Sequence, residues 1–357
     1  MNVLYVITGL GLGGAEKVVS DLADQMVVLG NNVKIAYLTG DILVRPISQD
    51  VELVALNLNS VKNLLLASKK YRKLVKSFRP DVVHAHMVHA NIFTRINRIA
   101  CSVPKLICTA HSSNEGGKAR MIAYRLTNRL SDVNTNVSQE ATATFIAKGA
   151  FAPNSLLTVY NGIDLNKFGK TSIRVGLSKD VVNIVTVGRF SDAKDYPNLI
   201  NAFALLKKNI PIAMTTNLTI VGDGELRYQI EALIKELKLD NDVILLGRRS
   251  DIPQLLSQAD IFVLASKFEG FGLVIAEAMA CECYVVATDC GGVAEVMGGT
   301  GKLVPINNSN ALANALKEAI ELNVDDRIDN NKKARERVEQ LFSLETSVQK
   351  WLHIYEI

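Results

Sequence analysis

The sequence of 357 residues has few cysteines, and their spacing matches no disulfide framework. The five, Cys101, Cys108, Cys281, Cys283 and Cys290, are an odd number scattered along the chain. Few and irregularly spaced cysteines are typical of a reducing compartment. We therefore expect no disulfide bond and a cytoplasmic location.

Long apolar runs are also missing. Apolar residues make up 48% of the chain, but no run approaches the roughly 18 residues that a membrane-spanning helix needs. Residues 2–7 are mostly apolar, follow no basic segment and run directly into glycines, so we interpret them as a first strand and expect no secretory signal. The length predicts two domains, each large enough for its own core.

No complete set of metal ligands is visible. His84, His86 and His89 lie close together, but no matching carboxylates or cysteines accompany them. We expect His84 and His86 to point to opposite faces of their strand. The sequence therefore predicts no metal site.

Charge is unevenly distributed. Residues 1–165 carry 18 Lys and Arg against 11 Asp and Glu, a net charge of +7, whereas the remainder has a net charge of −3. Much of the excess lies in the helical-period segment 69–79, which contains Lys69, Lys70, Arg72 and Lys73. Such a run is either a solvated helix face or a surface that contacts anionic lipid. Our hypothesis is that this half docks on the cytoplasmic leaflet; we expect no nucleic-acid partner.

Strands and helices alternate in two series, the pattern of two doubly wound parallel sheets in an α/β fold. The turn signal at 161–164 ends the first series, and we place a linker at 165–180. Parallel sheets bind ligands beyond the carboxyl ends of their strands, so two facing sheets predict a cleft between domains. We predict strands near 2–8, 33–38, 52–56, 81–85, 105–109, 133–136, 157–160, 182–187, 217–221, 243–246, 261–264 and 284–287.

The segment 267–277 places two carboxylates, Glu269 and Glu277, eight positions apart around the turn Gly270-Phe271-Gly272. It follows a predicted buried strand, and the Ala-rich residues from about Gly272 onward predict a helix. A helix N-terminus with free backbone amides attracts anions. This segment therefore predicts a site for a polar, anionic ligand.

A glycine loop near the N-terminus leaves a second interpretation open. Residues 9–14 satisfy Gly-x-Gly-x-x-Gly, the dinucleotide-binding fingerprint, so an NAD-dependent Rossmann enzyme is a rival. In that rival, an acid should end the second strand, but the predicted strand 33–38 is followed by Thr39 and Gly40. The fingerprint also leaves the second half of the chain without a role.

Together these motifs resemble the retaining, nucleotide-sugar-dependent glycosyltransferases of family 4, which have the two-domain GT-B fold. The landmarks follow the family's order across nearly the whole chain. They are Gly13-Gly14-Ala15, Val82–His86, Thr109-Ala110-His111, Tyr160–Asp164, Val187-Gly188-Arg189 with Lys194, Val221–Gly224 and the segment from Glu269 to Glu277.

The resemblance implies a domain organisation. Residues 1–165 would form an N-terminal acceptor-binding Rossmann-like domain, and residues 166–344 a C-terminal domain that binds the nucleotide sugar. Residues 345–357 would form a final helix that crosses back to the first domain. The two Rossmann-like domains would face each other across a cleft.

The resemblance also implies roles for the site residues. Arg189 and Lys194 would stabilise the departing diphosphate, which suits the fork of Arg and the point charge of Lys. Glu269 would hold hydroxyls of the transferred sugar, and His111 would lie near its anomeric carbon. Gly13 and Gly14 would face the acceptor. The donor-binding set would be Gly14, Gly188, Gly222, Asp223, Gly224, Arg248, Gly270, Phe271, Gly272, Leu273 and, at the ribose, Glu277.

The activity implied is transfer of a hexose or N-acetylhexosamine, with retention, from a UDP-sugar to a lipid-diphosphate-linked saccharide in bacterial surface polysaccharide (O-antigen or capsule) synthesis. The nucleotide sugar would be a co-substrate, with no further cofactor and no metal, on the cytoplasmic face of the inner membrane. A nucleotide-sugar epimerase or hydrolase of the same fold remains an alternative. A glycosidase would leave Arg189 and Lys194 without a task.

Overall fold

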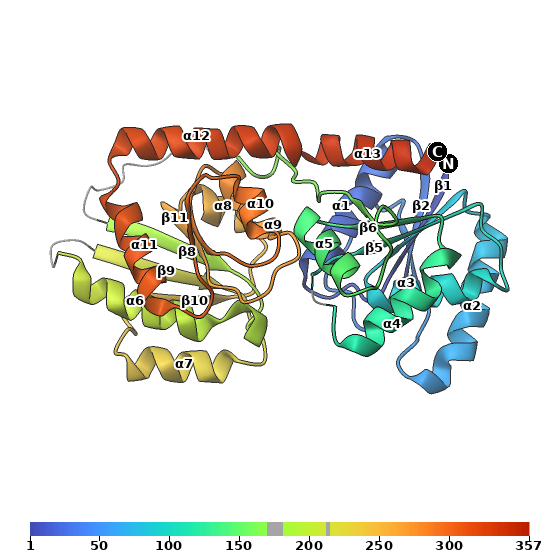
Figure 1. Ribbon diagram of the computed structural model, residues 1–357, viewed down its shortest axis with the longest axis horizontal. Coiled ribbons are helices and arrows are strands. Elements are labelled where there is room, and N and C mark those ends of the chain that lie inside the picture. The colour runs from blue at the N-terminus through green and yellow to red at the C-terminus, as the bar shows by residue number, and fades with distance from the viewer. Residues whose placement is uncertain (114, 170–180, 212–214, 357) are drawn as a thin grey trace. The chain divides into compact units, whose positions relative to one another are not determined.

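The computed structural model describes residues 1–113, 115–169, 181–211 and 215–356 (Figure 1). The chain folds into two compact units, Met1–Gly162 with Glu345–Ile357, and Ile163–Leu344. Each unit is a parallel sheet covered by helices, so the predicted α/β fold class with two doubly wound sheets is confirmed. Most of the linker predicted at 165–180 lies outside the described residues.

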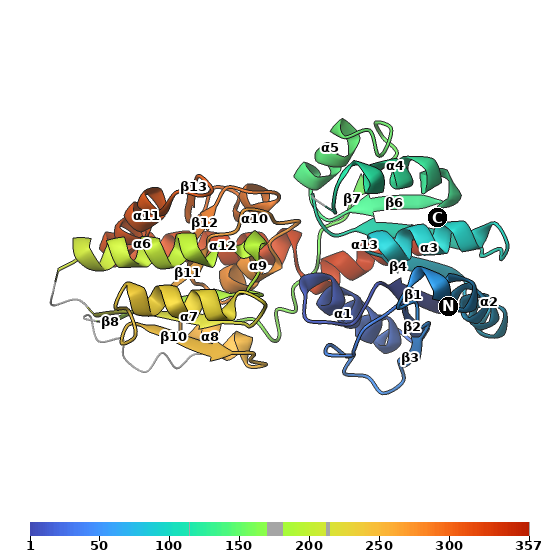
Figure 2. The ribbon, with the colours of Figure 1, turned by 90° about the horizontal axis from the view of Figure 1, so that it is seen from below.

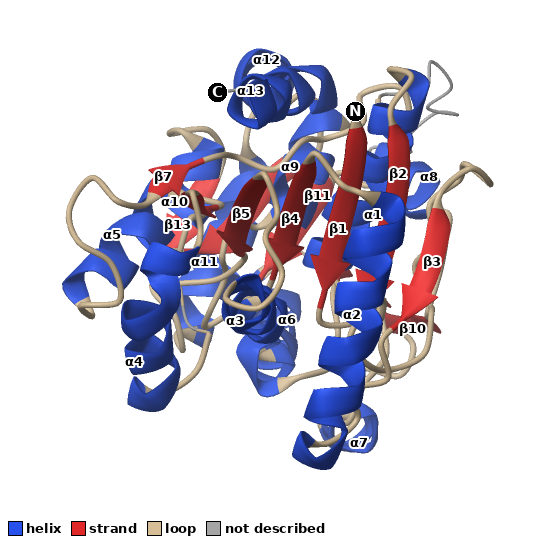
Figure 3. Ribbon diagram, turned by 90° about the vertical axis from the view of Figure 1, so that its right-hand side faces the viewer, coloured by secondary structure: helices blue, strands red, loops and turns tan. Residues whose placement is uncertain are grey.

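In the described part of the first unit, seven strands form one parallel sheet in the order β3-β2-β1-β4-β5-β6-β7. Figure 3 shows β5, β4, β1, β2 and β3 side by side. The strand β1 is central, and its side chains are almost all buried because it has neighbours on both edges and helices on both faces. The strands are β1 (Asn2–Ile7), β2 (Asn32–Tyr37), β3 (Glu52–Ala55), β4 (Val82–His86), β5 (Lys105–Ala110), β6 (Val133–Asn136) and β7 (Leu157–Thr158).

The helices of the first unit follow the helical period of the sequence. In the basic segment, Ala67, Tyr71 and Val75 recur every four residues, and this face is buried in the core while the lysines face outward. The helices are α1 (Gly14–Val28), η1 (Val61–Asn63), α2 (Leu64–Phe78), α3 (Val88–Arg98), α4 (Lys118–Thr127), η2 (Asn128–Leu130), α5 (Gln139–Ala147) and α13 (Leu344–Glu356).

The final helix α13 packs on the first sheet through aromatic side chains. The ring of Trp351 lies 4.4 Å from the ring of His84, centroid to centroid. The hydroxyl of Tyr355 lies 2.7 Å from Nδ1 of His84 and 3.1 Å from the hydroxyl of Tyr5. These contacts fix the C-terminal segment to β1 and β4.

The second unit has a parallel sheet in which six strands are described, in the order β10-β9-β8-β11-β12-β13. They are β8 (Val181–Val187), β9 (Thr215–Val221), β10 (Val243–Gly247), β11 (Ile261–Leu264), β12 (Tyr284–Thr288) and β13 (Lys302–Val304). Apart from β13, which the sequence does not predict, all strands of both sheets match the predicted ranges to within two residues.

Helices cover both faces of the second sheet. Helices α6, α7 and α11 share one apolar core with its strands, and α6 and α7 run side by side in Figure 2. Helices α8, α10 and α12 pack against α9. The helices are η3 (Asp192–Lys194), α6 (Tyr196–Asn209), α7 (Arg227–Glu236), α8 (Ile252–Ser257), α9 (Leu273–Ala280), α10 (Val293–Met297), α11 (Ser309–Glu321) and α12 (Val324–Leu341).

The strand order decides where each unit can bind a ligand. In the second sheet β8 pairs with β9 on one side and with β11 on the other, so the chain reverses its direction of winding at β8. In the first sheet β1 pairs with β2 and β4 in the same way. Ligands of doubly wound sheets bind at such switch points, beyond the carboxyl ends of the strands.

Candidate active site

The loop after β11 contains the Gly-Phe-Gly turn and leads into α9. Gly272 is the N-cap of α9 and has a φ of +81°, a left-handed conformation that favours glycine. Phe271 is buried and lies edge-on against Phe342, with 5.2 Å between ring centroids. The helix begins where the sequence predicts, with Glu269 in the loop before it and the buried Glu277 within it.

An ion pair joins this loop to the loop after β8. Nζ of Lys194 lies 2.5 Å from Oε1 of Glu269, which also accepts a hydrogen bond from the hydroxyl of Ser266 at 2.8 Å. The two charged side chains are mostly buried, so solvent screens their attraction only in part. The structure thus brings together two of the predicted catalytic residues.

Lys267 reinforces the same connection. Its backbone N–H donates to the carbonyl of Ala193 at 2.8 Å, and its ammonium group lies 3.1 Å from Asp192 and 3.6 Å from Asp195. The hydrogen bond to Asp192 raises the pKa of Lys267. The turn that carries Lys194 is therefore held on both sides.

Three predicted glycines lie where two backbones approach closely. Gly222 has a φ of +147°, and a Cβ at this position would lie 1.9 Å from the carbonyl oxygen of Gly188. A Cβ at Gly224 would lie 2.4 Å from the carbonyl oxygen of Phe190. Larger residues at these positions would force the loops after β8 and β9 apart.

Two further residues, which the sequence analysis does not predict, support the loops after β8 and β11. The hydroxyl of Tyr196 donates to the carbonyl of Gly188 at 2.8 Å, and burial raises the pKa of this hydroxyl. A Cβ on Gly291, in the loop after β12, would lie 1.9 Å from the carbonyl oxygen of Glu269. The Gly291-Gly292 pair is the sequence signal that could have indicated this close contact.

The remaining predicted cations lie at the surface. The side chain of Arg189 is 67% exposed and lies 3.4 Å from Glu225. Asp223 lies 4.0 Å from Arg248 and 3.6 Å from Arg227. Arg189 and Lys194 thus share the loop after β8 but have different partners. Because the side chain of Arg189 is exposed, its guanidinium is accessible to a ligand.

In the first unit, the glycine loop joins β1 to α1. Gly13 is the N-cap of α1 in an extended conformation, and Gly14 is the first helical residue. A Cβ on Gly9 would lie 3.0 Å from the carbonyl oxygen of Thr39, so this loop passes closely over the end of β2. The hydroxyl of Thr39 donates to Asn59 at 2.7 Å, in the region where a dinucleotide-binding enzyme needs an acid.

The expectation that His84 and His86 point to opposite faces is wrong. Their rings lie 4.0 Å apart, centroid to centroid, and both are fully buried on the side of β4 that faces α13. Residues two apart on a strand share a face, because successive side chains alternate. No group of three or more His, Cys, Asp or Glu that could hold a metal ion occurs in the described parts of the chain.

His111 lies at the end of β5, as the sequence predicts, and its ring meets a second imidazole. Nε2 of His111 is 2.9 Å from Nδ1 of His86. Burial lowers the pKa of His111 to about 4 and holds the pKa of His86 well below its ordinary value. Both imidazoles are therefore neutral near pH 7, and one N–H is shared between them.

Comparison with protein families accounts for both units. The family described as Glycosyltransferase Family 4 matches residues 12–167, and Glycosyl transferases group 1 matches residues 170–337. The chain belongs to the GT-B glycosyltransferases of family 4. This settles the choice left open by the glycine fingerprint in favour of a sugar-transferring enzyme.

Two curated relatives of this glycosyltransferase have names that specify lipid-linked saccharides as acceptors. The N-acetylgalactosamine-N,N'-diacetylbacillosaminyl-diphospho-undecaprenol 4-alpha-N-acetylgalactosaminyltransferase of Campylobacter jejuni is 29% identical over 88% of this chain and 89% of its own length. The UDP-Gal:alpha-D-GlcNAc-diphosphoundecaprenol alpha-1,3-galactosyltransferase of Escherichia coli is 27% identical over 84% of this chain and 81% of its own.

A solved structure agrees with this assignment. Anabaena HepE, crystallised in complex with UDP-glucose, is 25% identical to this glycosyltransferase. It superposes with a TM-score of 0.84 over 100% of this chain and 99% of its own.

Proposed function

We propose that this glycosyltransferase moves a hexose or N-acetylhexosamine from a UDP-sugar to a saccharide carried on undecaprenyl diphosphate, in the assembly of a bacterial surface polysaccharide. The acceptor class is suggested by the two relatives, whose names specify diphospho-undecaprenol saccharides. The donor class is suggested by the UDP-glucose bound to HepE. The roles proposed for single residues are those that the family resemblance implies, and we take the chemistry of each side chain as support for them.

The observation that carries the proposal is the ion pair of Lys194 and Glu269 beside the amide-rich turn before α9. Breaking a sugar–phosphate bond leaves negative charge on the nucleoside diphosphate, and a fixed cation stabilises that charge where it develops. Lys194 supplies such a cation, and its ion pair with Glu269 holds the ammonium group in a fixed position. Arg189, on the same loop and accessible, adds a second.

The other residues of the second unit fit the remaining parts of a UDP-sugar. Glu269 is suited to accept hydrogen bonds from hydroxyls of the transferred sugar, and the buried Glu277 to accept them from the two ribose hydroxyls. The close backbone contacts at Gly222 and Gly224 hold the loops after β8 and β9 against each other, and we propose that the main chain there borders the donor. Asp223 and Arg248 would border the base.

In the transfer step, the bond between the anomeric carbon and the phosphate oxygen breaks while a bond to the acceptor oxygen forms. The proton of the acceptor hydroxyl passes to the departing phosphate oxygen, so that attack occurs on the face from which the phosphate leaves and the anomeric configuration is retained. Neutral His111 would border the sugar near the anomeric carbon. Gly13 and Gly14 would border the acceptor. The two cations take the part of a metal ion, so we propose no metal and no further cofactor.

A membrane-borne acceptor requires the enzyme to work at the lipid surface. The described helices include none with both the length and the apolar composition needed to cross a bilayer. Contact through α2 would allow this. Val61 in η1 and Leu65 and Leu66 in the first turn of α2 are exposed. Lys69, Lys70 and Lys73 line a hollow of about 360 Å³ beside the helix. We propose peripheral binding to the anionic cytoplasmic face of the inner membrane.

The proposal is tested by incubating the enzyme with a panel of UDP- and GDP-sugars, with and without an undecaprenyl-diphosphate disaccharide. We expect a lengthened lipid-linked saccharide with a UDP-sugar, and NMR of the product should show the anomeric configuration of the donor. An inverted linkage would contradict retention. Release of free sugar, or interconversion of donors without acceptor, would indicate a hydrolase or an epimerase instead.

A further inference from the structure

A buried carboxylate lies in the loop between β5 and α4, four residues after His111. Glu115 is only 9% exposed, although glutamates are rarely buried without partners. Its Oε1 accepts a hydrogen bond from the backbone N–H of His111 at 2.9 Å. Its Oε2 accepts one from the hydroxyl of Tyr124 at 2.5 Å. Glu115 therefore connects the main chain at His111 to helix α4.

Helix α3 holds the hydroxyl of Tyr124 in turn. Nδ2 of Asn91 lies 3.1 Å from this hydroxyl and also donates to the carbonyl of Thr109 at 2.9 Å. The strand that precedes His111 and the tyrosine that holds Glu115 thus share one amide group. A chain of hydrogen bonds runs from β5 through α3 and α4 back to the loop.

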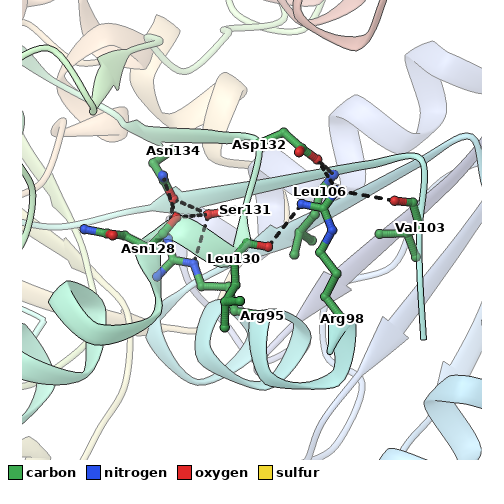
Figure 4. Close-up of polar contacts among 9 residues, drawn as sticks. All are labelled: Arg95, Arg98, Val103, Leu106, Asn128, Leu130, Ser131, Asp132 and Asn134. Atoms are coloured by element: carbon green, nitrogen blue, oxygen red, sulfur yellow. Dashed lines mark hydrogen bonds and ion pairs between the residues drawn. The ribbon is translucent and has the colours of Figure 1, made fainter. Parts of the chain in front are cut away.

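The ring of Tyr124 is fixed by a buried arginine on α3. The guanidinium carbon of Arg95 lies 5.2 Å from the ring centre. Arg95 is fully buried and donates to the hydroxyl of Ser131 at 3.2 Å and to the side-chain oxygen of Asn134 (Figure 4). Since these partners belong to the segment around β6, the tyrosine rests on the core of the unit.

The charges around Glu115 are consistent with a carboxylate that accepts hydrogen bonds. Burial raises the pKa of Glu115, whereas the hydrogen bonds from Tyr124 and His111 and the charges of Arg120 and Arg95 oppose that rise. Arg120 also donates to the backbone carbonyl of Glu115 at 2.6 Å. A hydrogen bond to a charged acceptor is stronger than one between neutral groups. The carboxylate of Glu115 therefore holds the hydroxyl of Tyr124 and the N–H of His111 firmly.

The position of the His111 ring depends on its own loop, because the ring of its partner His86 is held in the core. His86 is fully buried on the central part of the sheet, and His84 lies directly beside it. The 2.9 Å contact between the two imidazoles forms only if the loop holds His111 at one position. The backbone N–H of His111 is the group that Glu115 holds.

We propose that Glu115 is a positioning residue: its carboxylate fixes the main chain at His111 and thereby the orientation of the imidazole against His86. The importance of this orientation for sugar transfer rests on the function proposed above. The orientation itself does not, so it can be tested without substrate.

The test compares Glu115→Ala and Glu115→Gln with Tyr124→Phe and a control, Glu52→Gln, whose carboxylate lies at the surface on the edge strand β3. Glutamine keeps an oxygen for the N–H of His111, and the hydroxyl of Tyr124 can accept from its amide. Thermal melts followed by circular dichroism establish that each variant is folded. The readouts are the ¹⁵N signals of the histidine rings at pH 7, without ligand, and kcat and donor KM in the transfer assay.

In the wild type and in Glu115→Gln we expect His111 to show one fixed neutral tautomer. In Glu115→Ala we expect averaged ring signals and a kcat lower by roughly 10²-fold, the cost of a displacement of about 1 Å, with little change in donor KM. The kcat of Tyr124→Phe should lie between that of the wild type and that of Glu115→Ala. The ring signals and kcat of Glu52→Gln should match those of the wild type.

Unchanged ring signals and kcat in Glu115→Ala would overturn the proposal, and so would an equal loss of kcat in Glu115→Gln. A protein that transfers no sugar at all would refute the function proposed above, while the ring signals would still decide the role of Glu115.

Discussion

Lys194 and Glu269 form an ion pair of 2.5 Å although 75 residues separate them in the sequence. Lys194 ends the short helix after β8, and Glu269 lies in the loop after β11. The two strands are neighbours in the sheet, so their carboxyl ends bring these loops together. A cation and a carboxylate therefore lie next to the N-terminus of α9, as expected of a site for a sugar diphosphate.

Replacing Lys194 should slow the chemical step. We expect Lys194→Met to lower kcat by roughly 10²-fold or more, because the leaving diphosphate loses a preorganised cation. The matched control is Lys207→Met, which removes a cation paired with Asp242 elsewhere on the same unit. Steady-state kinetics with a saturating donor gives the comparison, and equal turnover of the two variants would exclude this role for Lys194.

Arg189 offers a second and separate test of charge stabilisation. Because its guanidinium is mostly exposed and its ion pair with Glu225, at 3.4 Å, lies at the surface, Arg189→Ala should leave the stability of the fold unchanged. We expect kcat to fall by roughly 10²-fold if the guanidinium acts on the leaving group. Thermal melts and kcat measured on the same sample separate an effect on stability from one on turnover. A variant with the kcat of the wild type would show that Arg189 takes no part in the mechanism.

Gly222 should tolerate no side chain. Gly222→Ala places a Cβ 1.9 Å from the carbonyl of Gly188 in a backbone conformation with φ of +147°, so both strain and a clash result. Gly299→Ala is the matched control, since its φ is +88° but no atom of the described residues lies within 4 Å of the added Cβ. Backbone strain costs both variants about 1–3 kcal/mol, and the clash adds to it only at Gly222, so we expect a lower Tm for Gly222→Ala than for Gly299→Ala. Equal Tm shifts would show that the loops separate without cost.

The buried imidazoles should make the fold less stable in acid. The pKa of each of His84, His86 and His111 is lowered, chiefly by burial, so they stay neutral in the folded state. In the unfolded chain their pKa is about 6.5, and the unfolded state therefore binds more protons as the pH falls through 6.5 toward about 4. The stability that they contribute is complete above pH 6.5 and is lost below it.

Denaturant unfolding at pH 7.5, 6.5 and 5.5 measures this loss. We expect the free energy of unfolding to fall between pH 6.5 and 5.5, with a slope of up to about 1.4 kcal/mol per pH unit for each histidine. Glu115 acts in the opposite direction, because its pKa is raised. His84→Asn should reduce the slope, and an unfolding free energy that does not change with pH would contradict neutral burial.

The cations of α2 should govern binding to anionic membranes. Replacing Lys69, Lys70, Arg72 and Lys73 by Ala removes four cations, each worth about 1 kcal/mol near such a surface, so partitioning should fall by more than about 10²-fold. The control replaces Lys207, Lys208, Lys332 and Lys333 in the second unit and removes the same charge. Flotation with vesicles rich in anionic lipid measures both, and equal flotation of the two variants would leave α2 as a solvated face.

The sequence predicts those parts of the fold that depend on local patterns. The strand β11 reads directly from its apolar run, and α9 from the glycines before it and the alanines within it. The strand β13 escapes because it has only three residues, of which Lys302 and Leu303 are exposed. Its pairing with β12 exists only in the assembled sheet.

The sequence identifies Lys194 and Glu269 as candidate site residues because the motifs around them resemble those of the family. The supporting residues depend on contacts between distant segments and are missed. Glu115 reads as an ordinary loop acid until Tyr124 and the N–H of His111 meet it. The placement of Arg189 and His111 against substrate stays a prediction.

The central claim is that the loops after β8 and β11 bind the diphosphate of a nucleotide sugar. A crystal structure of the enzyme with bound UDP tests it most directly. We predict diphosphate oxygens within hydrogen-bonding distance of Nζ of Lys194 and the guanidinium of Arg189, next to the backbone amides at the start of α9. A nucleotide bound elsewhere, with Lys194 still paired only with Glu269 and Arg189 facing solvent, would contradict the account.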